Sequence, residues 1–177
     1  TPHMLNGNLN FGTNSQLKLI DTTLIVDSSS SVDLGASGTL SGEGGILNAT
    51  LLTLNVQSTF TSVGGGLEIQ SPVSWSCSSV QSINNIRFTS TLSIGPLCEI
   101  EMTGGEANEQ ITVGSGGSFS LSSILEISVL DKGAPVEGAT IIVDGQTVST
   151  DAFGEATAQT TARTVDSQGD VQGGIKT

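Results

Sequence analysis

The stretch LNATLLTLNV, residues 47–56, alternates apolar and polar residues over most of its length. This alternation is typical of a β-strand that buries one face. Similar stretches recur along the chain: GGGLEIQ (64–70), NNIRFTS (84–90), EQITVGSGG (109–117) and ILEISVL (124–130). They resemble successive copies of one structural unit, so we expect a repeated strand architecture.

The rest of the chain has the same pattern of short apolar runs. No window keeps apolar residues at helical spacing over three turns, and Gly, Ser and Thr interrupt every apolar run. The runs follow one another at intervals of about six to nine residues, close to one strand plus a tight turn. They begin at Leu17, Leu24, Val32, Leu51, Phe60, Leu67, Val73, Ile86, Leu92, Ile100, Ile111, Phe119 and Leu125.

Two all-β folds have this rhythm. One is a sandwich or barrel of antiparallel hairpins, and the other is a parallel β-solenoid whose coils take roughly 20 residues each. The very short strands, the recurring glycine doublets and the scarcity of Asn-Gly hairpin signals between residues 15 and 125 favour the solenoid. We therefore predict a parallel β-helix over residues 5–124, followed by a β-rich cap or partial β-sandwich over 125–177.

The two cysteines fit this prediction. Cys77 and Cys98 are separated by 98 − 77 = 21 residues, which is about one coil. Residues one coil apart lie about 4.8 Å apart, within the range that a disulfide spans. The alternative is two buried free thiols, since free cysteine is commonly buried. A disulfide would indicate an oxidising compartment, and therefore an extracellular or cell-surface protein.

The short strands with Gly and Asn at their corners resemble those of right-handed parallel β-helix proteins. This pectate-lyase-like architecture also occurs in phage tailspikes, adhesins and surface-layer proteins, and the resemblance covers about residues 5–128. In enzymes of this type, Asp residues bind calcium and an Arg or Lys acts as the base. Arg87 is the basic residue of the central coils, but no Asp residues can be placed beside it from the sequence.

The texture changes near Leu125. The segment VEGATIIVDGQTVSTDAFGEA, residues 136–156, has longer strands and an Asp-Gly pair between alternating runs, which is a strong hairpin signal. It resembles the carboxypeptidase-regulatory-like and related immunoglobulin-like modules of surface proteins. The matching positions are Gly133, Pro135, Val136, Gly138, Ala139, Thr150, Asp151 and Gly154. The resemblance implies a spacing or attachment role, with Thr150, Asp151 and Gly154 structural, in either a truncated module or a cap of the solenoid.

Composition excludes several classes of partner. The chain has 17 Asp and Glu against 5 Lys and Arg, a formal net charge of −12. Phosphate backbones and anionic membranes need a basic surface, so we expect no nucleic acid partner. No apolar run approaches the roughly 18 residues of a membrane span, so we expect no membrane insertion. Residues 1–4 are typical of a cloning scar, because a common restriction site encodes His3-Met4, and His3 is the single histidine.

Few residues in the sequence are candidates for metal binding, glycosylation or catalysis. Glu99 and Glu101 share one side of a strand and, with Glu106 and Glu109, are the weak candidates for a calcium site, to which Glu126 or Asp33 could add oxygen ligands. The alternative is a solvated acidic surface. Asn48-Ala49-Thr50 fits the N-glycosylation pattern. Trp75 is expected in the core.

No catalytic constellation is visible, since no residue pairs a nucleophile with a base. We therefore expect a non-catalytic, structural or adhesin-like extracellular segment of a larger surface or secreted protein, without a cofactor unless calcium binds. Its expected partners are glycans or neighbouring modules of the same parent chain. The alternative is a β-helix that binds or processes polysaccharides, with Arg87 and the acidic residues from Glu99 to Glu109 as candidates.

Overall fold

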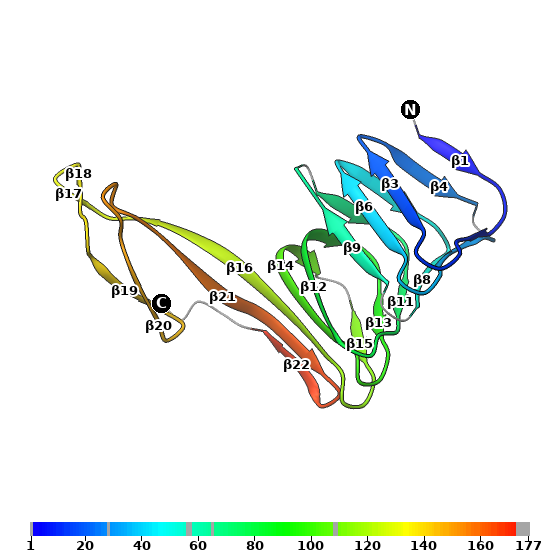
Figure 1. The fold of residues 1–177 in the computed structure, drawn as a ribbon. Helices are drawn as coiled ribbons and strands as arrows, with labels where there is room; N and C mark the ends of the chain where they lie inside the picture. The colour runs from blue at the N-terminus through cyan, green and yellow to red at the C-terminus, as the bar shows by residue number, and fades with distance from the viewer. Residues whose placement is uncertain (1, 28, 56–57, 65, 108–109, 173–177) are drawn as a thin grey trace.

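The computed structural model describes residues 2–27, 29–55, 58–64, 66–107 and 110–172. These residues form a parallel β-solenoid of about six turns, as predicted, and contain no helix. They accordingly include no helix that is long and apolar enough to cross a membrane. Figure 1 shows the coils stacked from the N-terminus towards β16, beyond which a β-hairpin arm extends away from the stack.

Three sheets make up the solenoid. The first has nine strands in the order β1 (His3–Leu5), β4 (Thr23–Val26), β7 (Gly45–Asn48), β10 (Leu67–Ile69), β12 (Val80–Phe88), β14 (Glu99–Ala107), β16 (Ser118–Ser128), β21 (Glu155–Asp166) and β22 (Gly169–Gln172). The second has six, β2 (Leu9–Asn10), β5 (Ser31–Leu34), β8 (Leu51–Leu54), β11 (Val73–Trp75), β13 (Leu92–Ile94) and β15 (Ile111–Val113). The third has three, β3 (Gln16–Ile20), β6 (Thr39–Glu43) and β9 (Thr59–Ser62).

The register sets the length of each coil. Leu9 pairs with Val32 near the N-terminus, so the coil between these two residues takes 23 residues. Further along, Leu92 pairs with Ile111, so a late coil takes 19. All strand pairs within the stack are parallel, as the absence of hairpin signals predicted.

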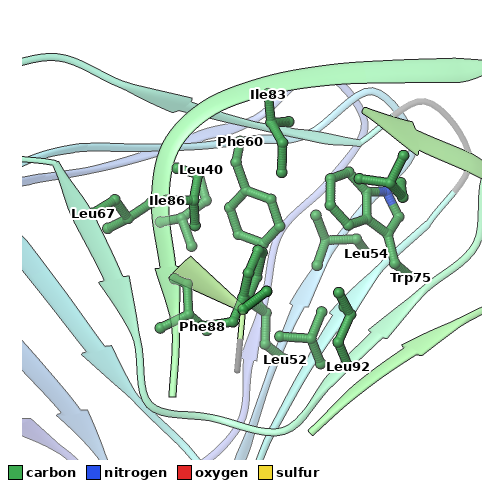
Figure 2. Close-up of a cluster of buried hydrophobic side chains, with 14 of the residues drawn as sticks. Leu40, Leu52, Leu54, Phe60, Leu67, Trp75, Ile83, Ile86, Phe88 and Leu92 are labelled. Carbon is green, nitrogen blue, oxygen red and sulfur yellow. The ribbon is translucent and has the colours of Figure 1, made fainter. Parts of the chain in front are cut away.

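Alternation along each strand builds the core. In β8, Leu52 and Leu54 point inwards and are fully buried, while their neighbours face outwards. Trp75 is also fully buried, which confirms its prediction as a core residue, and its indole Nε1 donates to the carbonyl of Ser58 at 3.1 Å. Its ring meets Phe60 edge-on at 4.9 Å, and Phe60 meets Phe88 at 5.5 Å (Figure 2). Aromatic residues of adjacent coils therefore interlock inside the stack.

Two strands of the nine-stranded sheet turn a corner without ending. β12 bends at Asn85 (φ 50°), and β14 bends at Gly104 and Gly105, whose φ angles are also positive. The first half of β12 lies beside β9, so the early halves of β12 and β14 continue the three-stranded side of the solenoid. Their later halves begin at Ile86 and Gly105. These halves continue the nine-stranded sheet, where β12 pairs with β10 and β14 pairs with β12.

β16 behaves differently from the strands before it. It pairs with β14 up to Ser122, then continues straight to Ser128 instead of turning the corner. β21 runs antiparallel along its whole length, and β22 pairs with the far end of β21. Val165 of β21 is buried against the solenoid core, so β21 covers the last coil.

The arm carries two small hairpins. β17 (Leu130–Asp131) pairs with β18 (Ala134–Pro135), and β19 (Thr140–Val143) pairs with β20 (Gln146–Ser149). Asp144 and Gly145, both with positive φ, form the turn of the second hairpin, which confirms that prediction.

The structural roles predicted for the end of this segment are also confirmed. Asp151 Oδ1 accepts hydrogen bonds from the backbone N–H groups of Phe153 and Glu155. Gly154 has φ 74°. Thr150 is buried, and its hydroxyl bonds to the backbone of Val136 and Ala139.

Candidate functional site

An open groove of about 430 Å³ lies on the outer side of the nine-stranded sheet, along the corner of the solenoid. Three glycines line it, Gly44 and Gly66 in successive coils and Gly105 two coils further on, with Asn85 at the corner of the coil between. Its wall carries Glu68 and Arg87, with Glu106 beyond them. We call this feature the corner groove. It is the strongest candidate for a binding site in the described part of the chain because charged side chains of several coils converge there.

The charged residues of the corner groove form a ladder. Glu68 on β10 pairs in register with Arg87 on β12, which pairs with Glu106 on β14. Arg87 Nη1 lies 3.2 Å from Glu68 Oε2, and Arg87 Nε lies 2.9 Å from Glu106 Oε2. The guanidinium is thus held between two carboxylates from the coils on either side.

The two neighbouring carboxylates keep the guanidinium of Arg87 protonated. The hydrogen bond to Glu106, the charge of Glu106 and the charge of Glu68 raise the pKa of Arg87 above its ordinary value. A general base must be unprotonated in order to accept a proton, and these contacts favour the protonated, charged form of Arg87. The geometry therefore suits Arg87 to donating hydrogen bonds to a hydroxyl-rich ligand better than to proton abstraction.

The ladder extends through neutral side chains. Glu68 Oε1 accepts a hydrogen bond from Gln70 Nε2 at 2.6 Å, and Gln70 Oε1 accepts one from Asn48 Nδ2 at 3.1 Å. Asn48 is the last residue of β7, and Thr50 lies two residues after it. Both are exposed, so the glycosylation pattern lies on the surface beside this network.

The three acidic candidates within the described residues lie on two different sides of the solenoid corner. Glu99 and Glu101 lie on the first half of β14, pairing with Val80 and Ser82, and both are exposed. Glu106 lies beyond the corner on the second half of β14, where it contacts Arg87. Glu109 falls outside the described residues. Within the described ranges, no group of three or more His, Cys, Asp or Glu side chains could hold a metal ion.

Cys77 and Cys98 are joined by a disulfide with Cα atoms 4.7 Å apart. Cys77 follows β11 and Cys98 follows β13, and these two strands are neighbours in the six-stranded sheet. The bond therefore links adjacent coils at one corner.

Glu68 was missed as a functional candidate in the sequence. The signal that identifies it is the spacing: Glu68, Arg87 and Glu106 follow one another at intervals of 19 residues, which is the length of the later coils. Opposite charges repeated at the coil length predict a ladder once the coil length is known.

Comparisons with known proteins gave no match: no family model, no curated protein and no solved structure is similar enough to this chain to indicate a relationship.

Proposed function

We propose that this chain is a non-catalytic structural segment of a larger surface or secreted protein, in which the solenoid serves as a stiff spacer. The observation that carries this proposal is the continuous stack. Parallel pairing runs in register from β1 to β16, and core residues such as Leu34, Leu54 and Trp75 are buried in successive coils. Such a stack resists bending because every coil is bonded to its neighbours.

Two further features support a location outside the cell. The Cys77–Cys98 disulfide is of the kind that persists in oxidising compartments. The segment after Leu125 resembles carboxypeptidase-regulatory-like and immunoglobulin-like modules, which serve spacing and attachment in surface proteins. We propose that the solenoid is of the pectate-lyase-like type and that the arm leads into such a module, so that neighbouring modules of the parent chain are its partners.

Single-molecule energy transfer tests the spacer. Dyes attached at residue 4 on β1 and residue 120 on β16 lie at opposite ends of the stack. A stiff spacer predicts one narrow distance distribution that does not change with salt. A matched control places both dyes on a Gly/Ser linker, which gives a broad distribution. A broad distribution for the solenoid itself would refute the spacer role.

A second candidate function is glycan binding in the corner groove. It is favoured by Arg87, whose side chain is 55% exposed while it remains anchored by Glu68 and Glu106. The test is retardation in native gels that contain acidic or neutral polysaccharides, together with an assay for new chain ends in calcium and in chelator. Loss of retardation in Arg87→Gln, but not in Lys132→Gln, would establish the groove. Release of chain ends that depends on Arg87 would instead show an enzyme.

A further inference from the structure

The arm contains a strand edge that is open to pairing. β14 pairs with β16 as far as Thr103 and Ser122, and then turns away at Gly104. From Ser123 to Ser128, β16 pairs with β21 on one side. On its other side, no strand pairs with this stretch in the part of the chain that the structure describes. Figure 1 shows β16 extending past the coils in this way. Alternate N–H and C=O groups of such an edge point outwards and can pair with another strand.

An apolar pocket lies where this edge begins. A cavity of about 560 Å³ is lined by Ile124, Ile83, Thr103 and Gly104, among other residues of the corner. Ile124 is 61% exposed there, which is unusual for isoleucine. An apolar side chain of an added strand would cover Ile124 and gain from its burial.

Carboxylates lie on the face of the ribbon behind the far part of this edge, Glu126 on β16 itself and Asp151 and Glu155 from β21 and the turn before it. A cavity of about 550 Å³ is lined by Glu126, Asp151 and Glu155, with Ile127 and Ala156 beside them. No salt bridge joins these three carboxylates to a Lys or Arg among the described residues. This surface therefore complements a strand that carries basic side chains.

We propose that the Ser123–Ser128 edge of β16 binds an extended, basic peptide segment as an added β-strand. Backbone hydrogen bonds provide the pairing, Ile124 takes an apolar side chain, and Glu126 and Glu155 take lysine or arginine. A two-stranded ribbon is marginally stable in water, so a third strand also stabilises the arm. A second copy of this chain is disfavoured as the occupant because each copy carries a net charge of −12.

The probe is a short, fluorescently labelled peptide that alternates lysine and valine, and binding is followed by fluorescence anisotropy. Binding should be lost when alternate backbone nitrogens of the peptide are methylated, because this removes its hydrogen-bond donors without changing its charge. It should also be lost when glutamate replaces lysine. Equal binding of the methylated peptide would reduce the interaction to charge attraction and overturn the proposal, as would the absence of binding by the unmodified peptide.

Matched variants locate the site. Glu126→Gln with Glu155→Gln should weaken binding by about tenfold. Glu99→Gln with Glu101→Gln removes the same charge from β14 and should change binding by less than about twofold. Similar losses in the two double variants would contradict a site on the arm. Hydrogen exchange on the complex should show new protection at residues 123–128, and protection elsewhere without protection there would also refute the proposal.

Discussion

Gly104 and Gly105 are adjacent, yet their surroundings differ. Both have positive φ, 68° and 80°. A Cβ at position 105 would lie 2.1 Å from the carbonyl oxygen of Ile86 in the preceding coil, whereas one at position 104 meets nothing within 4 Å. We expect Gly104→Ala to lower the free energy of unfolding by about 1 kcal/mol, the cost of the left-handed backbone. Gly105→Ala should lower it by about 3 kcal/mol, since the clash is added.

Urea denaturation followed by the fluorescence of Trp75, the single tryptophan, measures both variants. The difference between them isolates the contact between coils, because the backbone penalty is common to both. Equal losses would contradict the close approach of β14 to β12 at this corner.

The disulfide gives a second prediction for individual side chains. Cys77 and Cys98 close a loop of about 21 residues, for which chain-entropy estimates give roughly 3 kcal/mol of stabilisation. We expect the Cys77→Ala, Cys98→Ala double variant to lose about this much stability in urea denaturation. Intact mass before and after alkylation is the control. Two thiols that alkylate without prior reduction would remove the basis of the prediction and of the extracellular proposal.

The capping strands β21 and β22 depend on Arg163. Its Nη1 donates to the carbonyl of Ala107 at the end of β14, and its Nη2 lies 2.7 Å from Asp170 Oδ2 on β22. The side chain is only 8% exposed. Arg163→Met should therefore lower the free energy of unfolding by about 2 kcal/mol, because a buried carbonyl loses its donor. The matched control is Arg87→Met, whose exposed ion pairs predict a clearly smaller loss.

Thermal and urea denaturation of the two arginine variants distinguish these cases. A loss in Arg87→Met as large as that in Arg163→Met would contradict the assignment of Arg163 as the residue that fastens the cap.

Strand positions were predictable where one face is buried, as in β8 and β11, because period-two alternation reports burial directly. The path that a strand takes beyond its last buried residue could not be predicted from this alternation. The segment from Ile124 to Leu130 alternates like the earlier coils, although it lies in the arm, because the same period fits a strand in a solenoid or in a ribbon. β12 was expected only from Ile86 onwards, whereas the strand begins at Val80. A positive φ at Asn85 lets this one strand turn a corner without losing its ladder.

The charged site was less predictable than the fold for a related reason. Glu68 and Arg87 become neighbours through register, and the coil length changes from 23 to 19 residues along the chain. A single sequence does not reveal where the coil length changes. The disulfide spacing of 21 residues lies between these values and indicated one coil without fixing the others.

Burial is distributed unevenly between the stack and the arm. Residues of the middle coils, such as Leu52, Trp75 and Ile94, are buried almost completely. In the arm, Ile142 and Phe153 are each more than 70% exposed. The stack is therefore a continuous core that holds the coils together, while the arm has little apolar burial of its own. Local opening should therefore cost less free energy in the arm than in the stack, because this free energy depends on the contacts that are lost.

Hydrogen exchange tests this division on the intact chain. Amides of β8, β11 and β13 have paired strands on both sides and should exchange most slowly, with protection close to that of global unfolding. Amides of β19 and β20, in a hairpin with a single partner each, should exchange about a hundredfold faster or more, since a lone hairpin is marginal in water. Reduction of the disulfide should speed exchange near β11 and β13 first. If every protected amide exchanged at one common rate, the arm and the solenoid would unfold as one unit, and the stiff spacer with an adaptable arm would be the wrong description of this chain.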